Sequence, residues 1–244
     1  MLKKILKYGS LAAISCYLLF ALTIIPAQKD DNCCKELELE IEGNRLGTID
    51  NAEIIDMLKT EGLMPTGKVM DSISCLDIEQ FIKKMSLIDE CQAYKTNDKR
   101  VKLHIVCREP LLKICNRQGE IFYIDTHGYK IDDLKKPLIL PVASGYIDEK
   151  MLNNEIRFVV TALKNDPFWL AQTEQIYFDN KKEAVITPRM GNHIIELGTV
   201  TDIEEKLKNV KEFYRKGLNT VGWNKYSKLN VKISNKVICT IREK

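Results

Sequence analysis

The feature that most restricts the fold of this chain is an uncharged, largely apolar stretch near its amino terminus. Residues 8–25 contain no Asp, Glu, Lys or Arg. A helix of that length rises roughly 27 Å, enough to cross the hydrocarbon core of a bilayer. Three lysines precede the stretch and two aspartates follow it: Lys3, Lys4, Lys7, Asp30 and Asp31. Because basic flanks stay in the cytoplasm, we predict a single-pass anchor with its amino terminus inside and the bulk of the chain outside.

Two other interpretations of this stretch are weaker. A cleaved signal peptide has the same basic start, but Ile25 puts a bulky side chain where signal peptidase prefers a small one. A lipoprotein cut before Cys16 would leave the mostly apolar residues 17–25 at the start of the mature chain. We therefore favour an uncleaved anchor.

Charge and composition limit the class of protein. The chain is 45% hydrophobic and has 37 basic against 34 acidic side chains, so the three lysines before the anchor account for the whole excess of +3. A nucleic-acid binder needs surplus Lys and Arg to displace counterions from phosphates. We predict a folded ectodomain that does not bind nucleic acid.

Seven of the eight cysteines follow the anchor, in a compartment that permits disulfides. An odd number cannot all pair. There is no Cys-x-x-Cys and no cysteine with histidines at ligand spacing, so we predict no metal site. Cys91, Cys107 and Cys115 fall in predicted strands and are interpreted as small buried residues. Cys34 and Cys239 are the candidates for a disulfide.

The segment after the anchor has the pattern of a small α+β domain. Leu and Ile alternate with Glu over residues 37–42, which predicts a strand with one buried face. Asp50 and Glu53 form a capping box that predicts a helix to about residue 61, and Asp77 with Gln80 predicts the start of another. Two further strands are predicted at residues 88–95 and 101–107. The predicted order is strand, helix, helix, strand, strand.

The rest of the chain is richer in short strands. Helices are predicted from Asp148 to a stop at Asn165-Asp166-Pro167, and from Asp202 to Gly217. Strands are predicted at residues 111–115, 121–124, 138–141, 174–178, 183–187, 193–197, 228–234 and 237–241. We predict a mainly antiparallel β domain with flanking helices. The predicted organisation is a cytoplasmic tail (1–7), a transmembrane helix (8–25), a linker (26–35), a first domain (36–109) and a carboxy-terminal domain (110–244).

No catalytic pattern stands out. The three histidines are far apart in the sequence: His104, His127 and His193. Ser144-Gly145 lacks the flanking glycine of a nucleophile elbow, and Glu38, Glu40 and Glu42 are most simply the solvated face of a strand. We predict a binding protein without catalytic residues, cofactor or small-molecule substrate.

Several motifs, taken in order, resemble the FtsQ/DivIB family of cell division proteins, most closely the form found in Bacteroidota. LELEIEGNR at residues 37–45 looks like the first strand of an FtsQ-type POTRA domain, and VKLHIVCREP at 101–110 looks like its last strand and junction. The later matches are Ile124-Asp125-x-x-Gly128, Leu140-Pro141-Val142-x-x-Gly145, Phe168-Trp169, Pro188-Arg189-x-Gly191, residues 195–198, Lys206-Leu207, Phe213-Tyr214 and Gly222-Trp223-x-x-Tyr226.

The resemblance implies a non-catalytic divisome scaffold at the division septum, anchored in the inner membrane as a single-pass type II protein with its bulk in the periplasm. Such a scaffold joins early and late division proteins and binds FtsB, and with it FtsL, when a strand of FtsB adds to an open sheet edge. By match to the family, the contact residues would be Tyr226, Leu229, Val231 and Ile233, with Trp223 nearby. The aromatic pair could instead belong to the core, and the hairpin strand at 237–241 could close this edge. The POTRA domain would serve recruitment and other divisome components.

Two alternatives remain open at this point. A POTRA domain also fits a factor in outer-membrane protein transport or assembly, although the helices after residue 148 argue against a following membrane barrel. A membrane-anchored periplasmic hydrolase with an unrecognised site is the other alternative.

Overall fold

The computed structural model describes residues 15, 17, 32–132, 134–233 and 235–243. The predicted cytoplasmic tail, and the predicted anchor at 8–25 apart from Ser15 and Tyr17, lie outside the described residues. Within the described part of the chain, no helix combines the length and the hydropathy needed to cross a bilayer.

The first domain is a three-stranded sheet with two helices. Its elements are β1 (Glu36–Glu42), α2 (Asn51–Thr60), η1 (Met70–Ser72), α3 (Cys75–Ile82), β2 (Ile88–Lys95) and β3 (Arg100–Cys107). The strand order is β1-β3-β2, with β1 parallel and β2 antiparallel to β3. The predicted order of strand, helix, helix, strand, strand is confirmed.

Local hydrogen bonds explain where the two helices begin. The Asp50 side chain accepts a hydrogen bond from the Glu53 amide and caps α2, as the capping box predicts. The start predicted for the next helix is wrong, because Ser74 is the cap: its hydroxyl accepts from the Asp77 amide, and α3 begins at Cys75.

Alternation along β3 separates the two faces of this sheet. Val101, Leu103 and Ile105 are fully buried and face a core shared with α2 and α3, while the residues between them are half-buried. Period-two patterning therefore predicts both the strand and its buried side.

The second sheet has nine strands in the order β12-β11-β10-β9-β8-β7-β4-β5-β6. Its strands are β4 (Pro110–Asn116), β5 (Ile121–Asp125), β6 (Lys130–Ile131), β7 (Val142–Gly145), β8 (Thr173–Phe178), β9 (Ala184–Pro188), β10 (Ile194–Gly198), β11 (Tyr226–Asn230) and β12 (Ile238–Ile241). Five neighbouring pairs are antiparallel, and the three pairs β4·β7, β7·β8 and β10·β11 are parallel. The sheet is therefore mainly antiparallel, as predicted, and the three parallel pairs within it were not predicted.

Helical crossovers produce the last two parallel pairs. The helix predicted after Asp148 is two helices, α4 (Glu149–Asn153) and α5 (Glu155–Asn165), and it ends at Asn165 as predicted. A third helix, α6 (Pro167–Gln172), follows and completes the connection from β7 to β8. Asn154, with φ −119° and ψ −86°, breaks the first of them from the second. A second crossover joins β10 to β11 through α7 (Ile203–Phe213), the π-helical turn η2 (Tyr214–Leu218) and α8 (Asn219–Val221).

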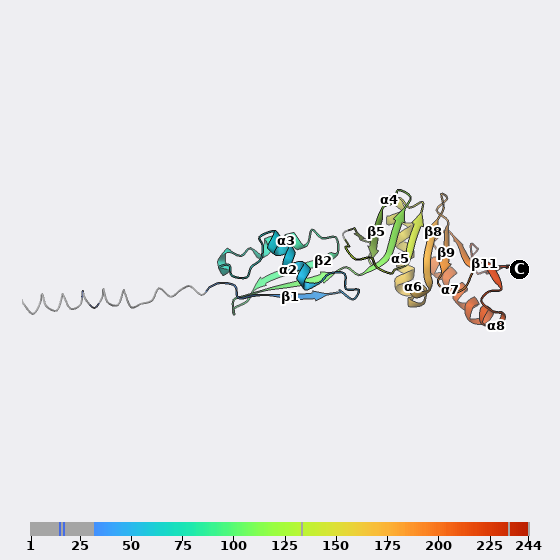
Figure 1. Ribbon diagram of the computed structural model, residues 1–244. Helices are drawn as coiled ribbons and strands as arrows, with labels where there is room; N and C mark the ends of the chain where they lie inside the picture. The colour runs from blue at the N-terminus through green and yellow to red at the C-terminus, as the bar shows by residue number, and fades with distance from the viewer. Residues whose placement is uncertain (1–14, 16, 18–31, 133, 234, 244) are drawn as a thin grey trace, which may run out of the picture.

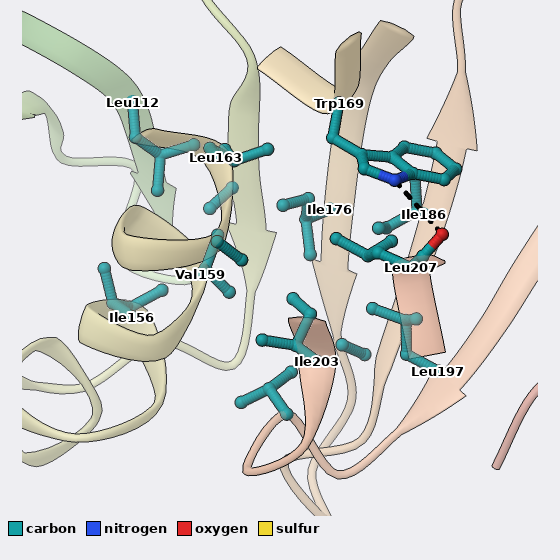
Figure 2. Close-up of a cluster of buried hydrophobic side chains, with 14 of the residues drawn as sticks. Leu112, Ile156, Val159, Leu163, Trp169, Ile176, Ile186, Leu197, Ile203 and Leu207 are labelled. Carbon is teal, nitrogen blue, oxygen red and sulfur yellow. Dashed lines mark hydrogen bonds between the residues drawn. The ribbon is translucent and has the colours of Figure 1, made fainter. Parts of the chain in front are cut away.

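Apolar side chains from these crossovers fill the core of the second domain. Figure 2 shows α5 residues such as Val159 and Leu163 beside Leu112 of β4, with Ile203 and Leu207 of α7 nearby. The Trp169 indole is buried among them and donates from Nε1 to the Leu207 carbonyl oxygen at 3.2 Å. This bond ties the first crossover to the second.

The two domains share contacts at their junction, and the molecule is elongated (Figure 1). Tyr123 of β5 and Ile131 of β6 are buried in the core of the first domain although they belong to the second sheet. The Asp132 amide donates to Ser86 Oγ at 3.0 Å, and Lys135 Nζ lies 2.5 Å from Glu53 Oε1. The junction is therefore a packed interface.

Candidate functional site

The carboxy-terminal end of the nine-stranded sheet holds the residues that the sequence predicts to bind a partner. Strand β11 pairs in parallel with β10 on one side and antiparallel with β12 on the other. Leu229, for example, is opposite Ile195 of β10 and Cys239 of β12. The predicted contact strand is therefore inside the sheet, and β12 is the edge strand (Figure 1).

The predicted aliphatic contacts separate into two groups. Leu229 and Val231 are 0% and 1% exposed and face the core, so their side chains cannot reach a partner. Ile233 is 59% exposed, but it lies beyond the end of β11 at Asn230. The predicted alternation 229, 231, 233 on an open strand is wrong, because β12 occupies the side that had to be free.

Trp223 and Tyr226 pack against the second crossover and are half-buried. The Tyr226 ring centroid lies 5.8 Å from that of Phe213, and the Trp223 centroid lies 4.9 Å from that of Tyr214. Trp223 Nε1 also donates to Asn219 Oδ1 at 3.2 Å. Both aromatic side chains thus pack between the end of the sheet and the helices, and part of each side chain remains exposed to solvent.

The second crossover continues past its predicted end. The sequence predicts that Gly217 closes the helix, but Gly217 lies inside η2, where a Cβ would come within 2.7 Å of the Phe213 ring. The chain leaves the helical region at Gly222, whose φ of +94° favours glycine. Glycine at 217 lets the π-turn pack closely, and π-turns are frequent near functional sites.

The main chain of β12 offers unpaired groups on its outer side. The Arg242 amide donates to the Lys225 carbonyl at 3.0 Å, so residue 242 points its backbone groups toward β11. Because these groups alternate along an antiparallel strand, those of Cys239 and Ile241 point outward. Ile238 and Ile241 are 53% and 65% exposed. The sequence did not identify β12 as the contact strand. Apolar and polar residues alternate in a similar way in both strands of the last hairpin, and the sequence alone does not say which strand is outermost.

The end of the sheet is basic. Residues 222–243 contain five cationic side chains and one acid: Lys225, Lys228, Lys232, Lys236, Arg242 and Glu243. Glu196 of β10 and Glu183, which directly precedes β9, neutralise two of the lysines, at 2.8 Å from Lys228 and 2.5 Å from Lys232. The remaining positive charge surrounds β12, so the edge favours an acidic partner.

The predicted disulfide between Cys34 and Cys239 is wrong in this structure, where both are free thiols. Cys34 is buried in the core of the first domain, beside the start of β1, whereas Cys239 packs on the core of the second domain. Because β1 and β12 belong to different ends of an elongated molecule (Figure 1), the two sulfur atoms cannot approach bonding distance. The burial predicted for Cys91 and Cys107 is confirmed, and burial raises the pKa of each thiol to about 11. Cys115, also predicted to be buried, is only half-buried.

The histidines are held in three unrelated places. His193 is buried, and its Nε2 lies 2.7 Å from the Tyr214 hydroxyl oxygen. His127 lies beside Thr126 in a turn, with 3.4 Å between Nδ1 and Oγ1. His104 lies beside Glu40 and Glu42, and these three are the one group of potential metal ligands gathered within the described residues.

Comparison with known families agrees with this division of the chain. Residues 32–106 match the model of the POTRA-like domain, and residues 109–240 match the model described as FtsQ/DivIB, C-terminal related. No curated protein matches the chain.

Proposed function

Since this chain belongs to the FtsQ/DivIB C-terminal related family, we propose that it is a non-catalytic scaffold of the cell division machinery that binds its partner by β-strand addition to β12. The open edge of β12 is the observation that carries the proposal. A strand without a second neighbour offers main-chain donors and acceptors in register, and alternate side chains of an added strand can fill neighbouring pockets.

The side chains at the β12 edge indicate what kind of segment the edge binds. Exposed Ile238 and Ile241 favour apolar side chains on the added strand, and the uncompensated lysines and Arg242 favour acidic ones. We infer an extended, acidic and apolar segment of an FtsB-like bitopic protein, with an FtsL-like protein bound alongside. Trp223 and Tyr226 support the edge from the helical side, and Tyr226 is near enough to β12 to join the contact, since it pairs with Ile241.

The remaining parts of the proposal concern placement in the cell. The uncharged residues 8–25 after three lysines support an inner-membrane anchor, with residues 1–7 in the cytoplasm. The predicted linker, 26–35, is too long at its end, because Cys34 is buried in the core of the first domain and Cys33 pairs with Val69. The first domain, 36–109, would then recruit other divisome components, while 110–244 binds the FtsB-like partner during septum formation.

A backbone substitution tests strand addition directly. Proline at 241 removes one outward N–H of the edge and leaves the inward bond of Arg242 to Lys225 in place. We expect Ile241→Pro to weaken binding of the full chain to the purified FtsB-like and FtsL-like proteins of the same organism at least ten-fold. The matched control Ile241→Ala removes the exposed side chain and keeps the N–H, so it should weaken binding less. Unchanged binding by the proline variant would contradict the proposal.

A further inference from the structure

The outer face of the first sheet carries a group of side chains that the proposed function does not use. On β1, four glutamates point to this face, because they alternate with the inward Leu37, Leu39 and Ile41: Glu36, Glu38, Glu40 and Glu42. The parallel register places Lys102 opposite Glu38, and His104 opposite Glu40. The central strand β3 thus places Lys102 and His104 beside the row of glutamate carboxylates on β1.

Two basic residues beside β1, Arg100 and Lys102, both pair with Glu38, and Arg100 also pairs with Asp98 at 3.0 Å. Arg100 Nη1 pairs with Glu38 Oε1, and Lys102 Nζ lies 2.9 Å from Glu38 Oε2. Hydrogen bonds from Lys102 and Arg100 hold the pKa of Glu38 below its usual range. In residues 32–132, no Lys or Arg pairs with Glu40 or Glu42. Among those residues, His104 is therefore the one basic side chain that pairs with either carboxylate.

The imidazole is held where it can share a ligand with both carboxylates. His104 Nε2 lies 3.2 Å from Glu42 Oε1, and the ligand atoms of Glu40, Glu42 and His104 all lie within 4.8 Å of one another. Ligands about 2.1 Å from a tetrahedral Zn²⁺ are roughly 3.4 Å apart, so small side-chain rotations bring the three into position. His104 is on the central strand with a side chain only 29% exposed, which limits its motion.

We propose that Glu40, Glu42 and His104 bind one Zn²⁺ ion on the outer face of the first domain. One imidazole nitrogen with two carboxylate oxygens suits Zn²⁺, whereas Ca²⁺ and Mg²⁺ prefer oxygen ligands alone. Three protein ligands leave the fourth position to water or to a side chain of a bound protein. The sequence does not reveal this site, because His104 is on β3 and reaches Glu40 and Glu42 only through the parallel pairing of β3 with β1.

Equilibrium dialysis of the full chain against Zn²⁺, with its thiols alkylated first, tests the site. We expect one bound ion per chain, with affinity reduced at least ten-fold by His104→Gln and by Glu42→Gln. Two controls remove the same side-chain types elsewhere: Glu38→Gln on the same strand and face, and His127→Gln in the second domain. Both should bind as the parent chain does.

Two results would overturn the proposal. One is the absence of a stoichiometric ion in the parent chain. The other is an equal loss of affinity in Glu38→Gln and Glu42→Gln, because that would mean that Zn²⁺ follows the general negative charge of β1. Binding of Co²⁺ gives a second readout, since a tetrahedral Co²⁺ ion has visible absorption bands that His104→Gln should abolish.

Discussion

Arg108 holds Asp125 at the junction of the two domains, with its Nη1 at 3.2 Å from Asp125 Oδ2. Its other terminal nitrogen, Nη2, lies 2.9 Å from Asp89 Oδ1 on β2 of the first domain. The second oxygen of Asp125 accepts from the amides of His127 and Tyr129, each at 2.8 Å. The Asp125 side chain is 1% exposed, so its charge depends on these partners. One guanidinium therefore joins a buried turn of the second domain to a strand of the first.

Loss of this guanidinium should destabilise the protein. We expect Arg108→Ala to lower the free energy of unfolding by about 3 kcal/mol, because it leaves Asp125 as a buried charge without its cation. Urea denaturation measures the change. The matched control is Arg45→Ala at the same junction, whose guanidinium lies 3.7 Å from Glu109 but is 81% exposed. That change should cost less than about 1 kcal/mol, and equal effects of the two variants would show that Arg108 is not special.

Neighbouring aromatic residues in α6 should differ in their contribution to stability. Trp169 is 1% exposed and its indole satisfies the Leu207 carbonyl, whereas Phe168 is 37% exposed. We expect Trp169→Ala to cost about 3–5 kcal/mol and Phe168→Ala about 1 kcal/mol in the free energy of unfolding. Similar losses in the two variants would mean that the packing in Figure 2 is not the main source of stability.

Gly145, the last residue of β7, has no room for a side chain. Its φ is +101°, and an added Cβ would overlap the carbonyl oxygen of Phe178 on β8. Gly119 also has a positive φ, +84°, but nothing lies within 4 Å of its Cβ position. We expect Gly145→Ala to cost about 3 kcal/mol or more, and Gly119→Ala about 1 kcal/mol from backbone strain alone. Thermal unfolding of both variants measures these costs. If Gly145→Ala is as stable as the parent chain, β7 and β8 must lie further apart than in this structure.

His193 should make stability depend on pH. Burial first, and then the positive charge of Arg242, holds the pKa of His193 below its usual 6.5. Above pH 6.5 the histidine is neutral in both the folded and the unfolded chain, so it does not make folding stability depend on pH there. As pH falls below 6.5, only the unfolded chain takes up the proton, so folding stability decreases until the folded pKa is reached.

Because of His193, we expect the free energy of unfolding to fall by up to about 1.4 kcal/mol between pH 7.5 and pH 5.5. The measurement is urea denaturation at both pH values for the parent chain and for His193→Gln, which retains a polar group for Tyr214. The other two histidines are present in both proteins, so any contribution from them cancels in the comparison. If the parent chain and the variant lose the same stability on acidification, His193 is not the group responsible.

Local patterns predicted much of the first domain. Alternation of Val101, Leu103 and Ile105 with polar residues identifies a half-buried strand, and the Asp50 cap identifies the start of α2. These signals depend on residues close together in the sequence. Strand order does not, and the mixed pairing of the second sheet follows from where its helical crossovers pack.

The candidate site shows why the sequence could not go further. Strand β11 contains the predicted contact residue Leu229, but the side of β11 that had to be open is covered by β12, which pairs antiparallel with it. Whether the last strand of a hairpin is inside or outside depends on the neighbour of the first strand, here β10. The pair of Arg108 and Asp125, 17 residues apart, and the approach of His104 to Glu42 are tertiary contacts of the same kind.

Photo-crosslinking in living cells from residue 241 tests the central claim most directly. A photoreactive residue in place of exposed Ile241 should give a dominant adduct with an FtsB-like single-pass protein, identified by mass spectrometry through an acidic, extended segment. The same residue in place of buried Val231 is the control and should give no such adduct. No adduct from 241, or equal adducts from both positions, would contradict binding at the β12 edge.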